Sequence, residues 1–366
     1  SHASSVVTWI GAVARSRPDR PALIQDGDPW SYAEFWSRSG AVARDLLARG
    51  LRSGQAVGIV GENDAAYIAT YFGILRAGGA AVPINAMLDP ASMCRQLKVV
   101  DPAAVYVGRV DDMTRDVLTS EFRVARMGGR PTSSSNPRFP AVGPNSVCAV
   151  MMTSGSTGEP KGVVHSHGSM LHGALQLAST FPYGTDQRGV VFLPLYACIP
   201  ELVLPMLLSG GSLEIVPRFD VDRVADACTR ATMVDAVPTI LSRLIENAPM
   251  DSLRQLSWVQ FASEPMPVTL LQRWWEELPG VERAGRQLPR PGPVTRGLRR
   301  VLASAGHDRG CAGSGDDGAR PGGSRRARRL GAGRGPADGG VGRRCSVRRR
   351  LVRCPDPRSA RPVAGP

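Results

Sequence analysis

Residues 153–162 read Thr-Ser-Gly-Ser-Thr-Gly-Glu-Pro-Lys-Gly and directly follow an apolar run at residues 147–152. Glycine allows backbone conformations with positive φ and brings N–H groups close to an anion, while the hydroxyl groups add donors. Lys161 adds a cation on a flexible stem, which can follow the charge of a phosphate. The stretch therefore predicts a strand that leads into a phosphate-binding loop.

The spacing of this loop differs from that of the Walker phosphate loop, in which the lysine is followed by Ser or Thr. Here Lys161 is followed by Gly162, and Gly155 and Gly158 are only three positions apart. A flexible Gly/Ser turn between two strands is the alternative interpretation of the same residues.

Apolar runs and helical patterns alternate along residues 20–180. A hairpin is expected around Asp26-Gly27-Asp28, because Asp-Gly favours tight turns with positive φ. Buried strands are expected at residues 56–60, 80–84 and 103–107, and helices at residues 41–49, 64–76, 90–99 and 168–180. This alternation is typical of an α/β fold with mostly parallel sheets covered by helices.

The loop sequence at residues 154–162, followed by Val-Val-His, resembles the phosphate loop of the adenylate-forming (AMP-binding) superfamily. Residues 30–34, 54–58 and 75–85 also resemble this family, and the chain is most similar to a fatty-acyl-CoA synthetase. The resemblance implies an AMP-binding N-terminal domain over residues 1–280. It also implies activation of a carboxylic (fatty) acid by ATP to acyl-AMP and then acyl-CoA, with Mg²⁺ and CoA as further cofactors.

The resemblance assigns roles to individual residues, although it assigns no catalytic residue and no metal ligand. The ATP phosphates are assigned to Thr153, Ser154, Gly155, Ser156, Thr157, Gly158 and Lys161. The adenine-loop candidates are Ser263, Glu264 and Pro265, and the acyl-pocket candidates are Tyr196, Ala197 and Pro238. Many relatives have histidine at the position of Ala197 and a glycine pair just before Pro265, so the chain departs from the family pattern at both sites.

Residues 281–366 differ from the rest of the chain in composition. They contain 21 Arg, 17 Gly, 10 Ala and 9 Pro and no aromatic residue. Such a segment cannot bury enough apolar area to offset its ordering entropy, so we expect it to be disordered. Arg, Gly, Ala and Pro have GC-rich codons, which suggests the hypothesis that this segment is translated out of frame.

The later motifs of the family are not found in residues 281–366. Relatives carry a ribose-binding aspartate and a distal catalytic lysine there, whereas Lys98 and Lys161 are the only lysines of this chain. We therefore expect a truncated enzyme with impaired or lost activity. A non-catalytic relic that binds nucleotide or an acyl chain weakly is the alternative.

The formal charge of +13 is unevenly distributed. Residues 281–366 carry a net charge of +15, which leaves −2 for residues 1–280. Nucleic-acid binding through the basic tail is a further alternative, but the tail has no aromatic side chain to stack on bases, and no specific nucleic acid is expected. The expected partner is a small-molecule carboxylic acid, and the sequence does not predict an oligomeric state.

Cysteine and histidine usage bears on compartment and metal binding. Seven cysteines without a C-x-x-C pair predict free thiols and a cytoplasmic location. His165, His167 and His172 have no Cys or acidic partner at ligand spacing, which favours structural histidines over a metal site. The apolar run at residues 190–208 contains three prolines and Glu201, which predicts a buried segment rather than a transmembrane one.

Overall fold

The computed structural model describes residues 5–129, 137–154, 159–285 and 351–353, and this part contains two seven-stranded sheets. The first sheet has the strand order β13 (Glu282–Gly285), β12 (Trp258–Phe261), β11 (Met233–Ala236), β9 (Arg188–Val191), β10 (Ser212–Ile215), β1 (Pro21–Gln25) and β2 (Asp28–Ser31). The second has the order β14 (Leu351–Arg353), β8 (Pro160–Ser166), β7 (Val147–Ser154), β4 (Ala80–Ile84), β3 (Ala56–Val60), β5 (Ala104–Val107) and β6 (Val124–Arg126). Neighbouring strands run parallel except in the β1–β2 and β7–β8 pairs, which confirms the predicted α/β fold with mostly parallel sheets.

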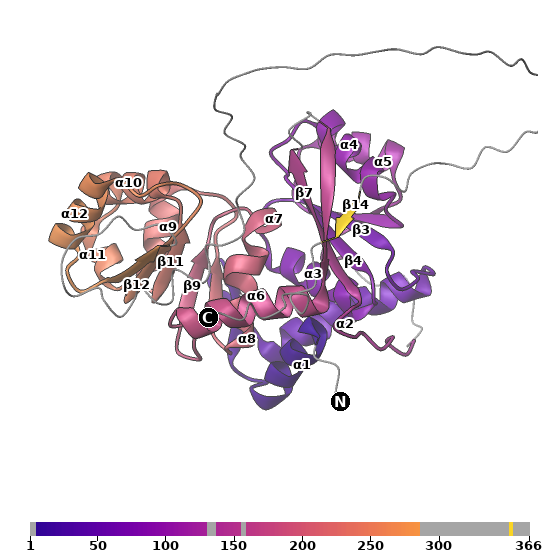
Figure 1. The fold of residues 1–366 in the computed structure, drawn as a ribbon, viewed down its shortest axis with the longest axis horizontal. Helices are drawn as coiled ribbons and strands as arrows, with labels where there is room; N and C mark the ends of the chain where they lie inside the picture. Colours follow the sequence, from indigo (N-terminus) through magenta and orange to yellow (C-terminus); the bar gives the residue numbers. More distant parts are fainter. Residues whose placement is uncertain (1–4, 130–136, 155–158, 286–350, 354–366) are drawn as a thin grey trace, which may run out of the picture. The chain divides into compact units, whose positions relative to one another are not determined.

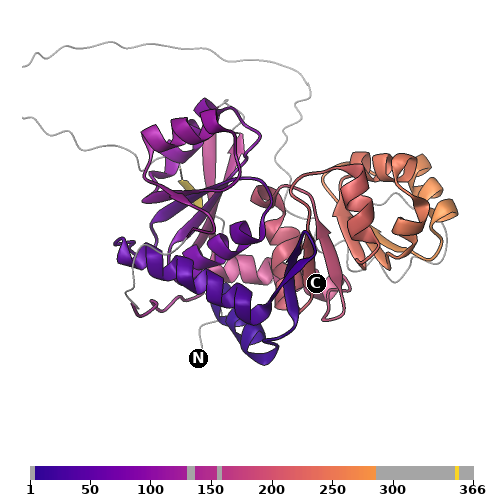
Figure 2. The same cartoon turned by 180° about the vertical axis from the view of Figure 1, so that it is seen from behind.

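The helices cover both faces of each sheet (Figure 1, Figure 2). One apolar cluster joins the facing sides of the two sheets to α1 (Val6–Ser16), α2 (Tyr32–Ala48), α3 (Ala65–Arg76), α6 (His167–Thr180), α7 (Leu195–Cys198), the π-helix η1 (Ile199–Val203) and α8 (Leu204–Leu208). On the other face of the first sheet pack α9 (Val221–Cys228), α10 (Pro238–Asn247), α11 (Met250–Arg254) and α12 (Val268–Glu277). On the other face of the second sheet pack α4 (Pro90–Val100) and α5 (Asp112–Glu121).

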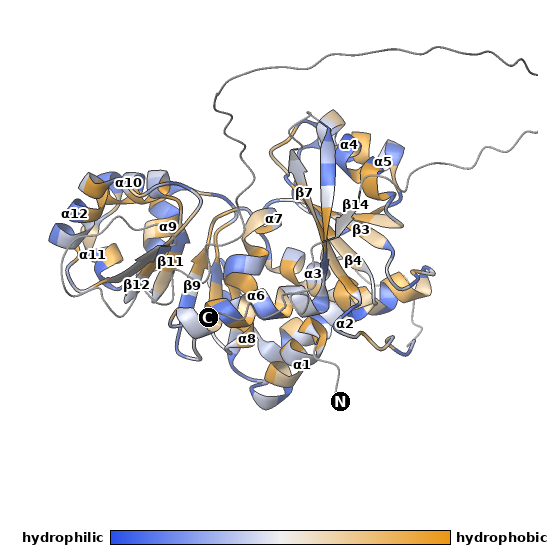
Figure 3. Ribbon diagram, viewed as in Figure 1, coloured by the Kyte–Doolittle hydropathy of each residue, from blue (hydrophilic) through white to orange (hydrophobic). Residues whose placement is uncertain are grey.

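Hydropathy follows this layering. In Figure 3 the strands β3 and β4 are mostly apolar, whereas α4 and α5, which cover them, carry both apolar and polar residues. A strand with helices on both faces has no solvent side and therefore reads as a continuous apolar run, while a surface helix needs only one apolar face. The predicted strands at residues 56–60 and 80–84 match β3 and β4 for this reason.

Local sequence patterns set the β1–β2 turn and the start of α2. Asp26 has φ 50° and Gly27 has φ 81°, the two positive values that a tight hairpin turn requires, so the predicted hairpin is present. The next helix was expected at residues 41–49 but begins at Tyr32. Ser31 and Glu34 form a capping box there, in which the Ser31 N–H donates to the Glu34 carboxylate at 2.8 Å.

The apolar run at residues 190–208 is confirmed as buried. It forms β9, α7, η1 and α8, and most of its apolar side chains are less than 9% exposed. None of the described helices has both the length and the apolarity that a membrane span requires.

The first sheet continues past the boundary expected at residue 280. β13 pairs in parallel with β12, from Trp258 opposite Glu282 to Phe261 opposite Gly285. β14 likewise pairs with β8 within the segment expected to be disordered. Composition missed both strands because ladder hydrogen bonds are made by the backbone and do not require aromatic side chains. The rest of that segment, residues 286–350 and 354–366, lies outside the described residues.

A single buried amide joins the ends of strands from the two sheets. Asn63, which follows β3, is 4% exposed. Its Nδ2 group donates to the Leu193 carbonyl at 3.1 Å and to the Val216 carbonyl at 3.2 Å, and its Oδ1 accepts from the Leu195 N–H at 2.9 Å. Leu193 and Leu195 follow β9 and Val216 follows β10, so one side chain fixes the ends of three strands.

His167, the first residue of α6, is fully buried, and neither ring nitrogen has a hydrogen-bond partner among the described residues. Burial lowers the pKa of His167 from 6.5 to about 4. The described residues contain no group of three or more His, Cys, Asp or Glu side chains that could hold a metal ion. His167 is therefore a neutral core residue at physiological pH.

We expect Asn63→Ala to lower the free energy of unfolding by about 2 to 4 kcal/mol, because three buried backbone groups lose their partner. Urea denaturation measures this change. The control is Asn85→Ala, since Asn85 accepts one hydrogen bond, from the Met87 N–H at 2.9 Å, near the surface. Its loss is expected to stay within about 1 kcal/mol. Equal losses in the two variants would contradict the joining role of Asn63.

We also expect a pH dependence of stability that originates at His167. Above pH 6.5 the ring is neutral in both states, but as the pH falls toward 4 the unfolded chain binds a proton that the folded chain does not. The free energy of unfolding should therefore fall by about 2 kcal/mol between pH 7.5 and 5 through this group alone. In urea denaturation, the free energy of unfolding of His167→Leu should lack this pH-dependent fall. The exposed His172→Leu should retain it, and an unchanged pH profile in His167→Leu would refute the assignment.

Candidate functional site

The predicted phosphate loop lies at the tip of the β7–β8 hairpin. The two strands pair in antiparallel register, with Thr153 opposite Lys161 and Ser154 opposite Pro160. The Thr153 hydroxyl donates to the Lys161 carbonyl at 3.4 Å, so the two ends of the loop are held together. The remaining loop candidates, Gly155, Ser156, Thr157 and Gly158, lie outside the described residues.

The side chains of Thr153 and Lys161 are both exposed. Directly opposed residues of an antiparallel pair lie on the same face, so the hydroxyl and the ammonium group are neighbours there. Lys161 makes no ion pair with any described residue, whereas the Lys98 ammonium lies 2.6 Å from a carboxylate oxygen of Glu121. An uncompensated cation fits a phosphate, which is the group that the sequence predicts here.

The acyl-pocket candidates lie on two elements that follow strands of the first sheet. Tyr196 and Ala197 belong to α7, where Tyr196 is half-buried and Ala197 is exposed. Pro238 is the buried first residue of α10. Both elements begin just beyond the carboxyl ends of parallel strands, β9 and β11, which is where ligands bind in open α/β sheets.

The adenine-loop candidates follow β12, the neighbour of β11. Here the structure connects two sets of candidates, because the carboxylate of Glu264 binds the residue after Pro238. The Thr239 hydroxyl lies 2.7 Å and 2.9 Å from the two carboxylate oxygens, and the Thr239 N–H donates to Oε2 at 3.3 Å. Glu264 therefore holds the start of α10 against the loop that contains Ser263 and Pro265.

The sequence did not predict this pair, because Thr239 and Glu264 are 25 positions apart and belong to different loops. The available signal was the parallel pairing of their strands. Ala236, the last residue of β11, lies opposite Phe261, the last residue of β12, so the two following loops are adjacent. An acidic side chain next to a free helix start favours such a contact.

A buried polar cluster lies behind α7. The Tyr183 hydroxyl lies 3.1 Å from the Gln260 side-chain oxygen and 3.0 Å from the Glu201 carbonyl. Gln260 is 2% exposed. Burial, together with the nearby Asp235 carboxylate, raises the pKa of the Cys198 thiol, so this thiol is protonated at neutral pH. The Tyr183 hydroxyl therefore links η1, which contains Glu201, to β12, which contains Gln260.

Ser263 has φ 73°, a left-handed conformation that is costly for a residue with a Cβ atom. Glycine adopts this conformation without that cost. We expect Ser263→Gly to raise the free energy of unfolding by about 0.5 to 1 kcal/mol, measured by urea denaturation. Ser209→Gly is the matched control, because Ser209 has φ −84°. It should lower stability by a similar amount, and the same sign in both variants would show that the loop is not strained.

Comparisons with known proteins agree on the family. Residues 11–285 match the AMP-binding enzyme family. The feruloyl-CoA synthase of Amycolatopsis sp is 30% identical over 278 residues, covering 73% of this chain and 56% of the relative. The indoleacetate–CoA ligase of Aromatoleum aromaticum is 28% identical over 274 residues, covering 68% and 54%. The chain thus spans about half the length of the curated relatives that it matches.

A solved structure shows the same fold with nucleotide bound. ATP-bound MatB from Rhodopseudomonas palustris superimposes with a TM-score of 0.67 at 24% sequence identity, covering 77% of this chain and 60% of MatB. The matched residues include every strand of the two sheets except β14 and extend to the end of β13. The chain therefore belongs to the adenylate-forming AMP-binding enzyme family, which uses ATP.

Proposed function

We propose that this chain is the ATP-binding and acid-binding lobe of an acid–CoA ligase. The observation that carries the proposal is the exposed pair of Thr153 and Lys161 at the end of the β7–β8 hairpin. The hairpin is fixed by its strands, so the cation is held beside a hydroxyl group whose proton would pass from the Lys161 carbonyl to an oxygen of the anionic ligand. The family match supports ATP as that ligand.

In the proposed reaction, a carboxylate oxygen of the acid attacks the α-phosphorus of ATP. The bond from this phosphorus to the bridging oxygen breaks, and pyrophosphate leaves with the electron pair. Lys161 and Thr153 would neutralise charge on the leaving phosphates, and Mg²⁺ would arrive bound to phosphate oxygens. In the second step, the thiolate of CoA attacks the acyl carbon and AMP leaves.

For the acid, we propose a carboxylate on an apolar body. The sequence resemblance favours a fatty acid, while the two relatives described above are named for feruloyl and indoleacetate. These acids share an apolar body, either a chain or an aromatic ring. Tyr196 and Ala197 would offer a half-buried ring and an exposed methyl group to such a body, and the resemblance places the larger histidine of many relatives at the position of Ala197.

The test measures binding of Mg·ATP by calorimetry. We expect Lys161→Ala to weaken binding by about ten- to hundredfold, because a charge-assisted contact to phosphate is lost. Lys98→Ala is the matched control and should bind like the wild type, since Lys98 is paired with Glu121 on the outer helices. Unchanged binding in Lys161→Ala would overturn the assignment of the hairpin.

The same experiment tests the class of acid. Decanoate, ferulate, indoleacetate and neutral benzyl alcohol are titrated in the presence of a non-hydrolysable ATP analogue. We expect binding of at least one carboxylate and none of the alcohol, and the carboxylate that binds identifies a chain or an aryl body. Binding is measured rather than turnover because the roles proposed for Lys161 and for the acyl loops are roles in binding.

A further inference from the structure

The contact between Glu264 and Thr239 joins the two sets of loop candidates. Glu264 is itself an adenine-loop candidate and lies between Ser263 and Pro265, whereas Thr239 follows the acyl-pocket candidate Pro238. The Thr239 hydroxyl lies 2.7 Å and 2.9 Å from the two carboxylate oxygens, and the Thr239 N–H donates to Oε2 at 3.3 Å. A displacement of either loop therefore acts directly on the other.

The start of α10 depends on the same carboxylate. Val237, at the N-cap position, makes no side-chain hydrogen bond to the first turn, and Pro238 has no N–H group. Thr239 is thus the first residue of the helix with an N–H to satisfy, and Glu264 accepts it from a different loop. The negative charge also interacts favourably with the helix dipole. Glu264 is therefore the N-cap acceptor that α10 lacks in its own sequence.

Both residues of the pair stand next to a proline. Pro238 has a fixed φ directly before Thr239, and Pro265 restricts the backbone of Glu264, which precedes it. On the other side of Glu264, Ser263 is held at φ 73°. Because the backbone on both sides of Glu264 is restricted, the positions of Ser263 and Pro265 determine where its carboxylate lies.

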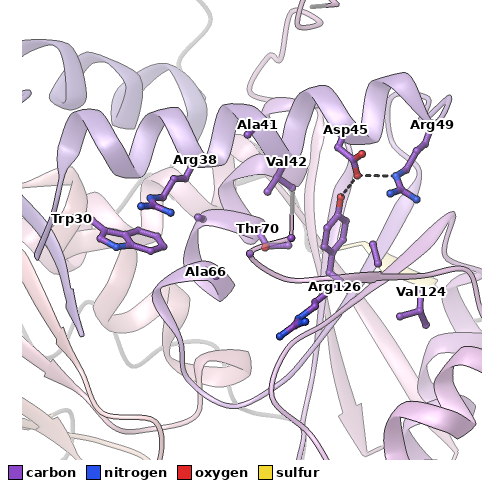
Figure 4. A pocket seen from close by; sticks show the side chains of 15 residues that line it. Trp30, Arg38, Ala41, Val42, Asp45, Arg49, Ala66, Thr70, Val124 and Arg126 are labelled. Carbon is purple, nitrogen blue, oxygen red and sulfur yellow. Dashed lines mark hydrogen bonds and ion pairs between the residues drawn. The ribbon is translucent and has the colours of Figure 1, made fainter. Parts of the chain in front are cut away.

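The contact is less fixed than another carboxylate contact of this fold. Asp45 on α2 lines a cavity beside α3, is 6% exposed and accepts from Arg49 Nε at 2.7 Å and from the Tyr106 hydroxyl at 3.0 Å (Figure 4). Glu264 is half-buried and makes no ion pair with any described residue, and Thr239 is exposed. A solvated hydrogen bond without a cation is weak enough to form or break as the loops are occupied.

We propose that Glu264 is a positioning residue that couples the nucleotide site to the acid site, an inference that rests on the proposed function. A nucleotide that packs on the loop at Ser263 and Pro265 fixes Glu264 against Thr239. The start of α10, with Pro238, is then fixed as well. The acyl loop loses its conformational entropy when the nucleotide binds, so the acid that follows loses less and binds more tightly.

The test measures a coupling factor by calorimetry of the full chain. Decanoate, ferulate and indoleacetate are each titrated with and without a saturating non-hydrolysable ATP analogue and Mg²⁺, and the factor is the ratio of the two dissociation constants. For the acid that binds, we expect a factor of at least about five in the wild type. Titration of the analogue with and without that acid should give the same factor, because coupling between binding sites is reciprocal.

Variants of the pair separate this coupling from direct contact between the two bound molecules. Glu264→Ala should lower the factor to below about two, and Thr239→Val, which keeps the N–H, should lower it about twofold. Thr239→Ser restores the hydroxyl and should give the wild-type factor. The double variant Thr239→Val/Glu264→Ala should match Glu264→Ala, since both substitutions break one contact.

Ser242→Ala is the matched control on the same helix. It removes a hydroxyl that lies 2.7 Å from Glu246 Oε1, an exposed contact of the same chemistry, and it should leave the factor unchanged. Because both pairs are exposed, the urea midpoints of all variants should stay close to that of the wild type.

The outcomes distinguish this inference from the proposed function. A wild-type factor of one, with nucleotide and acid both bound, would overturn the coupling and leave the proposed function in place. A wild-type factor retained in Glu264→Ala would assign the coupling to direct contact between the bound molecules and overturn the role of Glu264. If the wild type binds no nucleotide, or none of the three acids, the proposed function fails and this inference fails with it.

Discussion

The hydrogen bonds of Asn63 are the constraint on which the arrangement of the two sheets depends. At the ends of β3, β9 and β10 the ladders stop, and the backbone groups beyond them are buried without ladder partners. A buried amide can satisfy such groups from both sheets at once, whereas an apolar side chain would leave them unpaired. Since the acceptors have fixed positions, the amide also fixes the path of the chain into α7.

The direction of the strands connects this constraint to the position of the candidate site. Parallel strands deliver their following loops to one edge of a sheet, and in the first sheet β9, β11 and β12 lead to Tyr196, Pro238 and Ser263. The bond between Thr239 and Glu264 then sets the spacing of two of these loops. In the second sheet the antiparallel hairpin β7–β8 replaces this geometry, and the proposed phosphate loop joins its two strands.

Patterns that act over a few residues were predictable from the sequence. The Asp26-Gly27 turn, the buried strands β3 and β4 and the loop between β7 and β8 all follow from local chemistry. Contacts between distant residues were not predictable. Asn63 and Leu193, for example, are 130 positions apart, and their contact leaves no periodic pattern in the sequence. The start of α2 was not predicted, although its capping box is a local sequence pattern. β13 was not predicted because the prediction used side-chain composition, whereas the hydrogen bonds that pair β13 with β12 are made by the backbone.

The chain places arginine and lysine side chains in different environments, as the buried Arg76 and the exposed Lys161 show. Arg76 is 9% exposed, and its guanidinium donates to the Trp36 carbonyl and to the Ser39 hydroxyl, while it stacks 3.9 Å from the Trp36 ring centroid. Burial lowers the pKa of Arg76 to about 10, so it stays charged at neutral pH. A rigid planar fork suits such a fixed structural site, whereas a flexible ammonium suits a phosphate whose position changes during reaction. With only two lysines in the chain and Lys98 paired, Lys161 is the lysine to which we assign the proposed phosphate contact.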